Sequence, residues 1–133
     1  MVLFAAVHAY WALGGTAGLP AGLSLAGNTT LFVIDVVAIP LCLAGAWLAL
    51  ALARPWGRRL PRRVVLAAAW AVSALLVVHA VPAVVDGILL VTGLRSAELS
   101  TSERFSLFLY EPYWLFGGIL FGLATWSFQR ETA

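Results

Sequence analysis

Four long apolar stretches, separated by short polar or glycine-rich segments, dominate the hydrophobic and polar pattern of this chain. They cover about 2–17, 31–53, 64–85 and 105–128. A helix needs roughly 20 predominantly apolar residues to cross about 30 Å of hydrocarbon, so the last three are long enough and the first is short. Because short loops join antiparallel neighbours, the pattern predicts an all-α integral membrane protein. Its four spans form one antiparallel four-helix bundle, a single domain over 1–133.

Composition indicates that lipid surrounds this bundle. Of the 133 residues, 62% are hydrophobic and only 11% are charged, whereas a soluble domain carries about 25% charged residues. A chain with so few charges lacks the polar surface that water requires. The single cysteine, Cys42, excludes an intramolecular disulfide.

A cleaved signal peptide is an alternative interpretation of the first stretch. However, no basic segment precedes it, and it carries His8, Tyr10 and Trp11 within its apolar run. We therefore interpret it as a retained first span.

The positions of the arginines predict the orientation of the spans, and the sequence contains no lysine. Five of the eight lie in the 54–63 loop, while the 15–28 loop has no charge. Loops rich in basic residues stay on the cytoplasmic side. We therefore predict a multi-pass protein of the bacterial cell (inner) membrane with both termini in the cytoplasm. Topology alone explains the basic loop, and we expect no nucleic-acid partner.

The fourth stretch combines a small-residue face with an acid. Gly118 and Gly122 form a G-x-x-x-G pair, a spacing that lets helices approach closely in lipid. Glu111 lies seven residues before Gly118, two helical turns away on the same face. The helix either begins at Pro112 or begins at a capping box in the 100–103 segment and breaks near Pro112. We favour the second interpretation.

The other stretches also direct ionisable residues toward their small-residue faces. In the second, Pro40 bends the helix near Asp35. In the third, His79 and Asp86 share one face, about 10 Å apart along the axis. With His8 of the first stretch, these residues predict a polar constellation in the outer half of the membrane.

Two similar phrases, "HAYWALGG" at 8–15 and "EPYWLFGG" at 111–118, frame this constellation. We expect them to lie on antiparallel helices and to meet at one level, with the Tyr and Trp rings as pocket walls and the Gly-Gly pairs permitting close crossing. The predicted ligand-binding residues are His8, Tyr10, Trp11, Asp35, His79, Asp86, Glu111, Tyr113 and Trp114.

Three functions fit such a pocket, and the sequence leaves open whether the protein is an enzyme. The first is binding or transport of a small amphipathic or cationic ligand. The second is acid–base catalysis on a lipid or isoprenoid, with Glu111 as the acid and His79 and Asp86 as a coupled base. The third is a structural subunit whose polar residues only bond helices or cap them at the headgroup level. Membrane lipids are expected partners, and a homo-oligomer stays open.

We expect no cofactor and no metal. Two histidines on separate spans could ligate a haem iron, but straight helices place them at different depths. A divalent-metal site from Asp35, Asp86, Glu111 and a histidine is a further alternative. Phosphate-binding glycine loops and C-x-x-C, H-E-x-x-H and G-x-S-x-G motifs are absent from the sequence.

The opening phrase, the Asp86-Gly87 pair and the "LYEPYWLFGG" segment resemble a family of small bacterial four-span membrane proteins. Members begin with a comparable His-x-Tyr-Trp-Ala-Leu-Gly-Gly phrase. The similarity covers most of the chain, although only the first phrase is a near match. That family more often has Tyr-Ser-Pro where this chain has Glu111, and its function is unknown. The resemblance therefore implies an architecture and a polar outer site, not a reaction.

Overall fold

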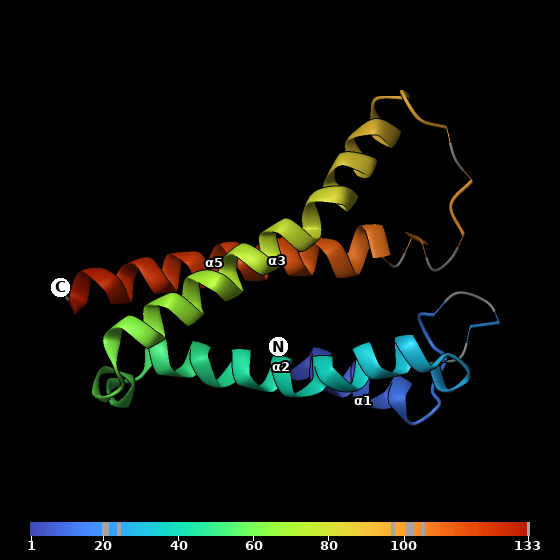
Figure 1. The fold of residues 1–133 in the computed structure, drawn as a ribbon. Coiled ribbons are helices and arrows are strands. Elements are labelled where there is room, and N and C mark those ends of the chain that lie inside the picture. Colours follow the sequence, from blue (N-terminus) through green and yellow to red (C-terminus); the bar gives the residue numbers. More distant parts are fainter. Residues whose placement is uncertain (20–21, 24, 97, 101–102, 105, 133) are drawn as a thin grey trace. The chain divides into compact units, whose positions relative to one another are not determined.

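The computed structural model describes residues 1–19, 22–23, 25–96, 98–100, 103–104 and 106–132, and every regular element in them is helical (Figure 1). The main helices are α1 (Val2–Ala12), α2 (Thr29–Ala53), α3 (Arg62–Val91) and α5 (Glu111–Glu131). Short 3₁₀ turns, η1 (Leu25–Gly27) and η2 (Pro55–Arg59), precede α2 and α3, and a π-helical turn, η3 (Ser106–Tyr110), precedes α5. The chain divides into two compact units, unit 1 (Met1–Leu48) and unit 2 (Ala49–Ala133).

Three helices in the described residues are long and apolar enough to cross a membrane. Large apolar side chains such as Ile34, Leu75 and Leu120 lie exposed on them. Contiguous exposed apolar surface marks a membrane or protein interface, which agrees with the predicted membrane environment. The four-helix bundle stays a prediction. The three helices cover Thr29–Ala53, Arg62–Val91 and Leu107–Glu131, close to the predicted spans 31–53, 64–85 and 105–128.

The prediction for the first span was wrong in extent, because α1 ends at Ala12 instead of near residue 17. Its 11 residues rise about 16 Å, roughly half of the hydrocarbon thickness. Gly14 has φ +96°, and the N–H groups of Gly14 and Gly15 donate to the carbonyls of Trp11 and Tyr10 at 3.0 and 2.9 Å. This Schellman motif requires the left-handed backbone that glycine adopts without strain. The glycines therefore end the helix.

Helix α2 begins at a side-chain cap and runs antiparallel to α1. The carboxamide oxygen of Asn28 accepts a 3.1 Å hydrogen bond from a backbone N–H of the first turn. His8 lies beside Asp35, and a Cβ added to Gly45 would lie 3.5 Å from the side chain of Met1. The two helices therefore run in opposite directions along each other.

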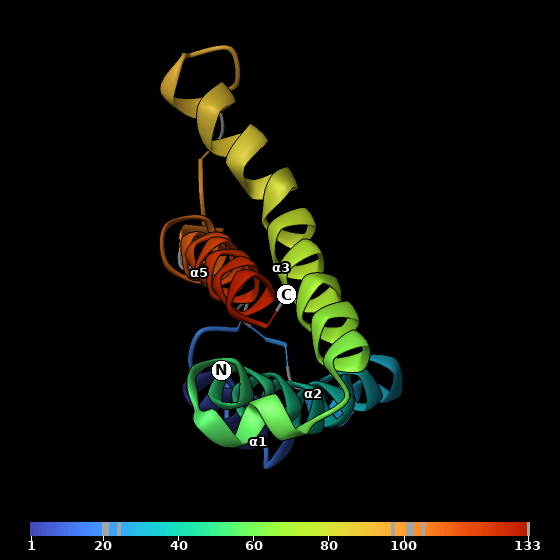
Figure 2. The same cartoon turned by 90° about the vertical axis from the view of Figure 1, so that its left-hand side faces the viewer.

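Helices α3 and α5 pack side by side in unit 2 (Figures 1 and 2). The Ser73 hydroxyl donates to the Gly118 carbonyl at 2.8 Å, and the Trp70 indole N–H donates to Gln129 Oε1 at 3.2 Å. These contacts make the two helices antiparallel. A Cβ on Gly118 would lie 2.8 Å from Val77 Cγ2, so the predicted small-residue stripe does permit close approach.

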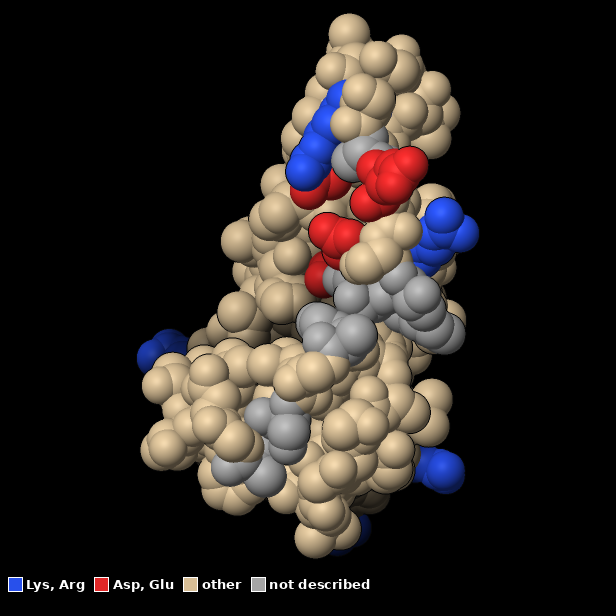
Figure 3. Space-filling view, turned by 90° about the vertical axis from the view of Figure 1, so that its right-hand side faces the viewer, with Lys and Arg blue, Asp and Glu red and all other residues tan. Residues whose placement is uncertain are grey.

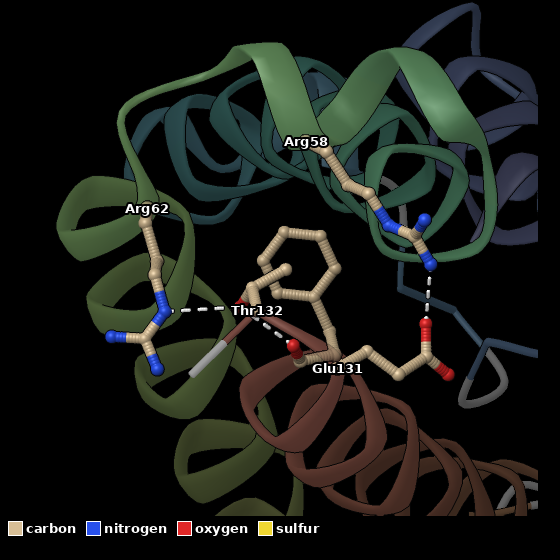
Figure 4. Close-up of polar contacts among 5 residues, drawn as sticks. Arg58, Arg62, Glu131 and Thr132 are labelled. Carbon is tan, nitrogen blue, oxygen red and sulfur yellow. Dashed lines mark hydrogen bonds and ion pairs between the residues drawn. The ribbon is translucent and has the colours of Figure 1, made fainter.

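Two arginines of the basic loop hold the carboxyl end of α5 (Figure 4). Arg58 Nη2 donates to Glu131 Oε2 at 2.6 Å. Arg62 donates to Thr132 Oγ1 at 3.0 Å and to the Gln129 carbonyl at 3.1 Å. Carbonyls in the last turn of a helix lack partners within the helix, so Arg62 satisfies one of them. The basic loop and the end of α5 therefore lie at the same end of unit 2.

Helix α3 is bent. Its C-terminal third, yellow in Figure 1, turns away from α5. Pro82 lies inside this helix. Proline removes one backbone hydrogen bond and clashes with the carbonyl four residues earlier, here that of Val78. The bend therefore has a local cause in the sequence.

Candidate functional site

The first histidine–carboxylate pair, called the unit 1 pair, consists of His8 and Asp35. His8 Nδ1 lies 2.5 Å from Asp35 Oδ1. The side chains are 17% and 4% exposed, respectively. The other carboxylate oxygen, Asp35 Oδ2, is buried and has no hydrogen-bond partner in the described residues. Half of this carboxylate is therefore unsatisfied.

Aromatic rings surround the imidazole of the unit 1 pair. Trp11 meets His8 edge to face, with ring centroids 5.4 Å apart, and Phe4 lies 6.1 Å away. The Trp11 indole N–H donates to the Ala17 carbonyl at 2.8 Å, which fixes the ring against the loop after α1. Trp11 is thereby held beside the imidazole of His8, and its role as a pocket wall stays a prediction.

Tyr10, also predicted as a wall, has another contact. Its ring packs on Gly15, and its hydroxyl accepts a 3.4 Å hydrogen bond from the Ala17 N–H. The side chain therefore covers the glycine turn that ends α1.

The second histidine–carboxylate pair, called the unit 2 pair, consists of His79 on α3 and Glu111 on α5. His79 Nε2 lies 3.8 Å from Glu111 Oε1, and the side chains are 57% and 16% exposed. This distance suits an ion pair but is too long for a hydrogen bond. Glu111 Oε2 is buried without a hydrogen-bond partner in the described part of the chain. Trp114 packs edge to face on His79 at 5.7 Å, and Tyr113 lies 6.0 Å from Trp114.

A π-helical turn positions Glu111. Pro112 has no N–H to bond the carbonyl of Phe108, four residues before it. The preceding turn, Ser106–Tyr110, is π-helical, and π turns occur frequently at functional sites. The α-helix proper begins at Glu111 with Pro112 in its first turn, so the predicted break takes the form of a change from π- to α-helix, and the backbone stays helical.

The predicted capping box before this turn is also confirmed. Glu103 Oε2 accepts hydrogen bonds from the Ser100 hydroxyl at 2.6 Å and from its N–H at 2.8 Å. The Glu103 N–H in turn donates a longer hydrogen bond, of 3.4 Å, to Ser100 Oγ. The hydrogen bond from the Ser100 hydroxyl, and to a smaller extent the bond from the Ser100 N–H, hold the pKa of exposed Glu103 below its ordinary value.

Asp86 pairs with Arg95 and not with His79. Arg95 Nη1 lies 2.5 Å from Asp86 Oδ1, and both side chains are about half exposed. Asp86 lies two helical turns, about 10 Å, along α3 from His79, so a shared face does not bring the two side chains into contact. Figure 3 shows acidic and basic side chains gathered near the C-terminal end of α3. The residues here line a cavity of about 140 Å³: Ala83, Asp86, Leu90, Arg95, Leu99, Glu103 and Leu107.

Sequence reasoning missed Arg95 as a partner. Gly93 has φ +71°, and the Arg95 N–H donates to the Leu89 carbonyl at 3.0 Å. This turn brings the chain back toward the end of α3. A glycine between an acid and an arginine near a helix end was the available signal.

The predicted site residues fall into separate groups. In unit 1, His8 contacts both Trp11 and Asp35. The second group lies in unit 2, and Asp86 is not part of it. A common pocket for both groups stays a prediction. Within the described ranges, no three or more His, Cys, Asp or Glu side chains are grouped to hold a metal ion, so the alternative metal site gains no support. The unit 2 group is His79, Glu111, Tyr113 and Trp114.

A family of proteins of unknown function, DUF3995, matches residues 1–121. The chain belongs to this family. Both histidine–carboxylate pairs lie within the matched residues, whereas Glu131 and Thr132 lie beyond them. The match agrees with the expected family of unknown function and assigns no activity. No curated protein and no solved structure matches the chain.

Proposed function

We propose that this protein binds or transports a small amphipathic cation at the unit 2 pair, in the bacterial cell membrane. The observation that carries the proposal is the state of Glu111. Its side chain is only 16% exposed, and its Oε2 is buried without a partner in the described residues. A buried acceptor without a donor costs about 1–3 kcal/mol, and more when charged, so a cation bound there supplies the missing interaction.

The neighbouring rings favour an organic cation over a bare metal ion. Trp114 and Tyr113 lie next to the pair, and aromatic faces attract ammonium-like cations. A hard metal ion prefers about six or more oxygen ligands, whereas this pair offers one carboxylate and one imidazole. The chemistry of the site therefore suits a cation with apolar surface.

The unequal exposure of the pair supports a route of entry. His79 is 57% exposed and Glu111 is 16% exposed, so a ligand meets the imidazole before it meets the carboxylate. An amphipathic cation dissolved in the membrane reaches the exposed face of a spanning helix without first entering water. His79 then acts as the outer member of the site.

We further propose that the basic loop faces the cytoplasm, with both termini directed to that side. The contacts of Arg58 and Arg62 with the end of α5 support this for the C-terminus. In a Cys42→Ala background, an impermeant thiol reagent added outside should label Ser96→Cys and leave Arg59→Cys unlabelled. The reverse labelling would overturn the orientation.

The site itself is tested with 2-phenylethylammonium, an amphipathic cation whose N–H groups can donate to Glu111 Oε2, and the purified protein in nanodiscs. Glu111→Gln keeps the shape of the side chain but removes its charge, so calorimetry should show at least about tenfold weaker binding, a change of about 1.4 kcal/mol. Its thermal unfolding temperature should not fall, because the substitution also removes a buried charge. Glu98→Gln, which changes an exposed loop carboxylate, should bind like the wild type. Equal affinity in the Glu111 variant contradicts the proposal, and lost stability without lost binding favours a structural subunit.

Acid–base catalysis on a membrane lipid is the second candidate. The observation in its favour is that a buried acid lies beside an exposed imidazole. Asp86 leaves this scheme because Arg95 holds it. Mass spectrometry of isoprenoid lipids incubated with the protein should then show conversion that both Glu111→Gln and His79→Gln abolish.

A further inference from the structure

The unit 1 pair gathers all of the side-chain charge available near neutral pH in its part of the chain. From Met1 to Ala53, the sequence contains one acid, Asp35, one histidine, His8, and no lysine or arginine. The fold places these two side chains 2.5 Å apart at the contact between α1 and α2. Each is therefore the other's only side-chain counter-charge within unit 1.

The geometry leaves one open position on each partner. Within the described residues, Asp35 Oδ2 is buried without a hydrogen bond, and His8 bonds through Nδ1 while its Nε2 makes no hydrogen bond. His8 is 17% exposed, and Asp35 is 4% exposed. The imidazole is therefore the more accessible member and the carboxylate the enclosed one.

Burial decides which charge states this pair tolerates. An isolated buried carboxylate loses its hydration, and a nearby opposite charge compensates only in part. Neutral His8 beside ionised Asp35 leaves one net negative charge in apolar surroundings. One added proton makes the pair neutral overall, as imidazolium with carboxylate or as imidazole with carboxylic acid.

We propose that the unit 1 pair is a proton-binding site whose ligand is a single proton that enters at His8 Nε2. In the unloaded state, Nδ1–H donates to the Asp35 carboxylate. The incoming proton forms the Nε2–H bond, after which the Nδ1–H bond can break as an Oδ1–H bond forms. The charge of the pair thus changes from one negative to zero, and no other reactant is needed.

Unit 1 contains three other titratable groups, which are Tyr10, Cys42 and the N-terminal amino group. Tyr10 packs on Gly15, Cys42 lies seven residues along α2 from Asp35, and Met1, whose backbone nitrogen is the N-terminal amino group, has its side chain against Gly45. Tyrosine and cysteine ionise only at higher pH. In the described residues of unit 1, neither Tyr10 nor Cys42 has a hydrogen bond or ion pair with the unit 1 pair.

The sequence makes this site unusually easy to observe. It contains two histidines and two aspartates, so His79→Gln combined with Asp86→Asn leaves His8 and Asp35 as the only residues of their kinds. Nitrogen-15 histidine and carbon-13 aspartate labels then report each partner separately by NMR in nanodiscs. No ligand is needed, so the result is independent of the proposed function at the unit 2 pair.

We expect the imidazole nitrogen and carboxyl carbon signals to move together in one one-proton step as pH is lowered, because a single proton is shared between the two groups. Asp35→Asn should uncouple the imidazole from this step and shift its midpoint. If the double variant does not fold, the His8 signal is obtained as the difference between the wild type and His8→Gln. Imidazole and carboxyl signals that change independently of each other, or an unchanged His8 midpoint in Asp35→Asn, would overturn the proposal.

Discussion

Unit 1 and unit 2 use the same two chemical groups in surroundings of very different charge. Unit 1 contains one of the six acids and none of the eight arginines, so the other five acids and all the arginines belong to unit 2. The histidine is 17% exposed in the unit 1 pair and 57% exposed in the unit 2 pair. The comparison teaches that burial, rather than residue type, decides how much each pair matters to the fold.

The two Gly-Gly phrases show a second difference between the units. Gly14 ends α1 through a left-handed backbone, with no atom within 4 Å of an added Cβ. Gly118 lies inside α5, where an added Cβ would lie 3.0 Å from the backbone nitrogen of Val77. The first position requires glycine for its conformation and the second requires it for space.

The largest predicted effect compares the histidines. His8→Leu should lower the free energy of unfolding by about 3–5 kcal/mol near neutral pH, because it leaves buried Asp35 without its counter-charge. His79→Leu should cost less than about 1 kcal/mol, because His79 is 57% exposed and lies 3.8 Å from Glu111, too far for a hydrogen bond. Denaturant unfolding in detergent micelles measures both. Adding Asp35→Leu to His8→Leu should restore most of the loss, and equal costs for the two histidines would remove the contrast between the units.

A packing change in α5 comes next in size. Gly118→Leu should cost about 1–3 kcal/mol, as overpacking does in well-packed cores, because the backbone of α3 blocks the new side chain. Gly117 is the matched control, since its added Cβ meets only Leu76 Cδ1 at 4.0 Å. Thermal unfolding in detergent should therefore separate Gly118→Leu from Gly117→Leu. Similar values would show that close approach of α3 and α5 does not depend on this position.

The corresponding change in α1 should act through conformation alone. Gly14→Ala places an L-residue in the left-handed region, which costs about 1–2 kcal/mol. Gly27→Ala is the control, because an added Cβ there meets nothing within 4 Å and its φ is not positive. The same unfolding assay measures both. A Gly14 variant as stable as its Gly27 counterpart would mean that the turn after α1 tolerates another conformation.

The smallest effect concerns an exposed charge of unit 2. Ser100→Ala removes the hydroxyl hydrogen bond that chiefly lowers the pKa of Glu103. Because the folded pKa is lowered, the stabilising contribution is present above the ordinary carboxyl pKa and disappears as pH falls through the folded value. The wild type should therefore lose a small stability advantage over Ser100→Ala between about pH 5 and about pH 3. A pH-independent difference between the two would assign the effect to helix capping alone.

The long helices were predictable because each is a continuous apolar run with polar ends, and lipid-facing residues need no partner. The capping box and the break near Pro112 were predictable too, since both depend on residues close in sequence. The end of α1 was missed, because the Gly-Gly phrase was interpreted as a helix crossing when its hydrogen bonds close the helix.

Which side chains of the candidate site pair with each other was harder to predict than which residues belong to the site. Helical spacing placed His79 and Glu111 on the inward faces of their helices, and the structure brings the two side chains to 3.8 Å. The spacing could not give the register between α3 and α5, which the Gly118 contact sets, nor the turn that gives Asp86 to Arg95. Pairing depends on contacts between helices, and a periodic pattern describes one helix at a time.

The bend in α3 gives the thickness of the host bilayer a structural role. Its 30 residues rise about 45 Å, half as much again as a hydrocarbon core of about 30 Å. A helix longer than the core accommodates by tilting or kinking. The C-terminal third of α3 already leans away from α5, so a thinner bilayer favours a stronger lean and a thicker one a straighter helix. We therefore expect bilayer thickness to change the width of the cavity between Asp86 on α3 and Leu107 on η3.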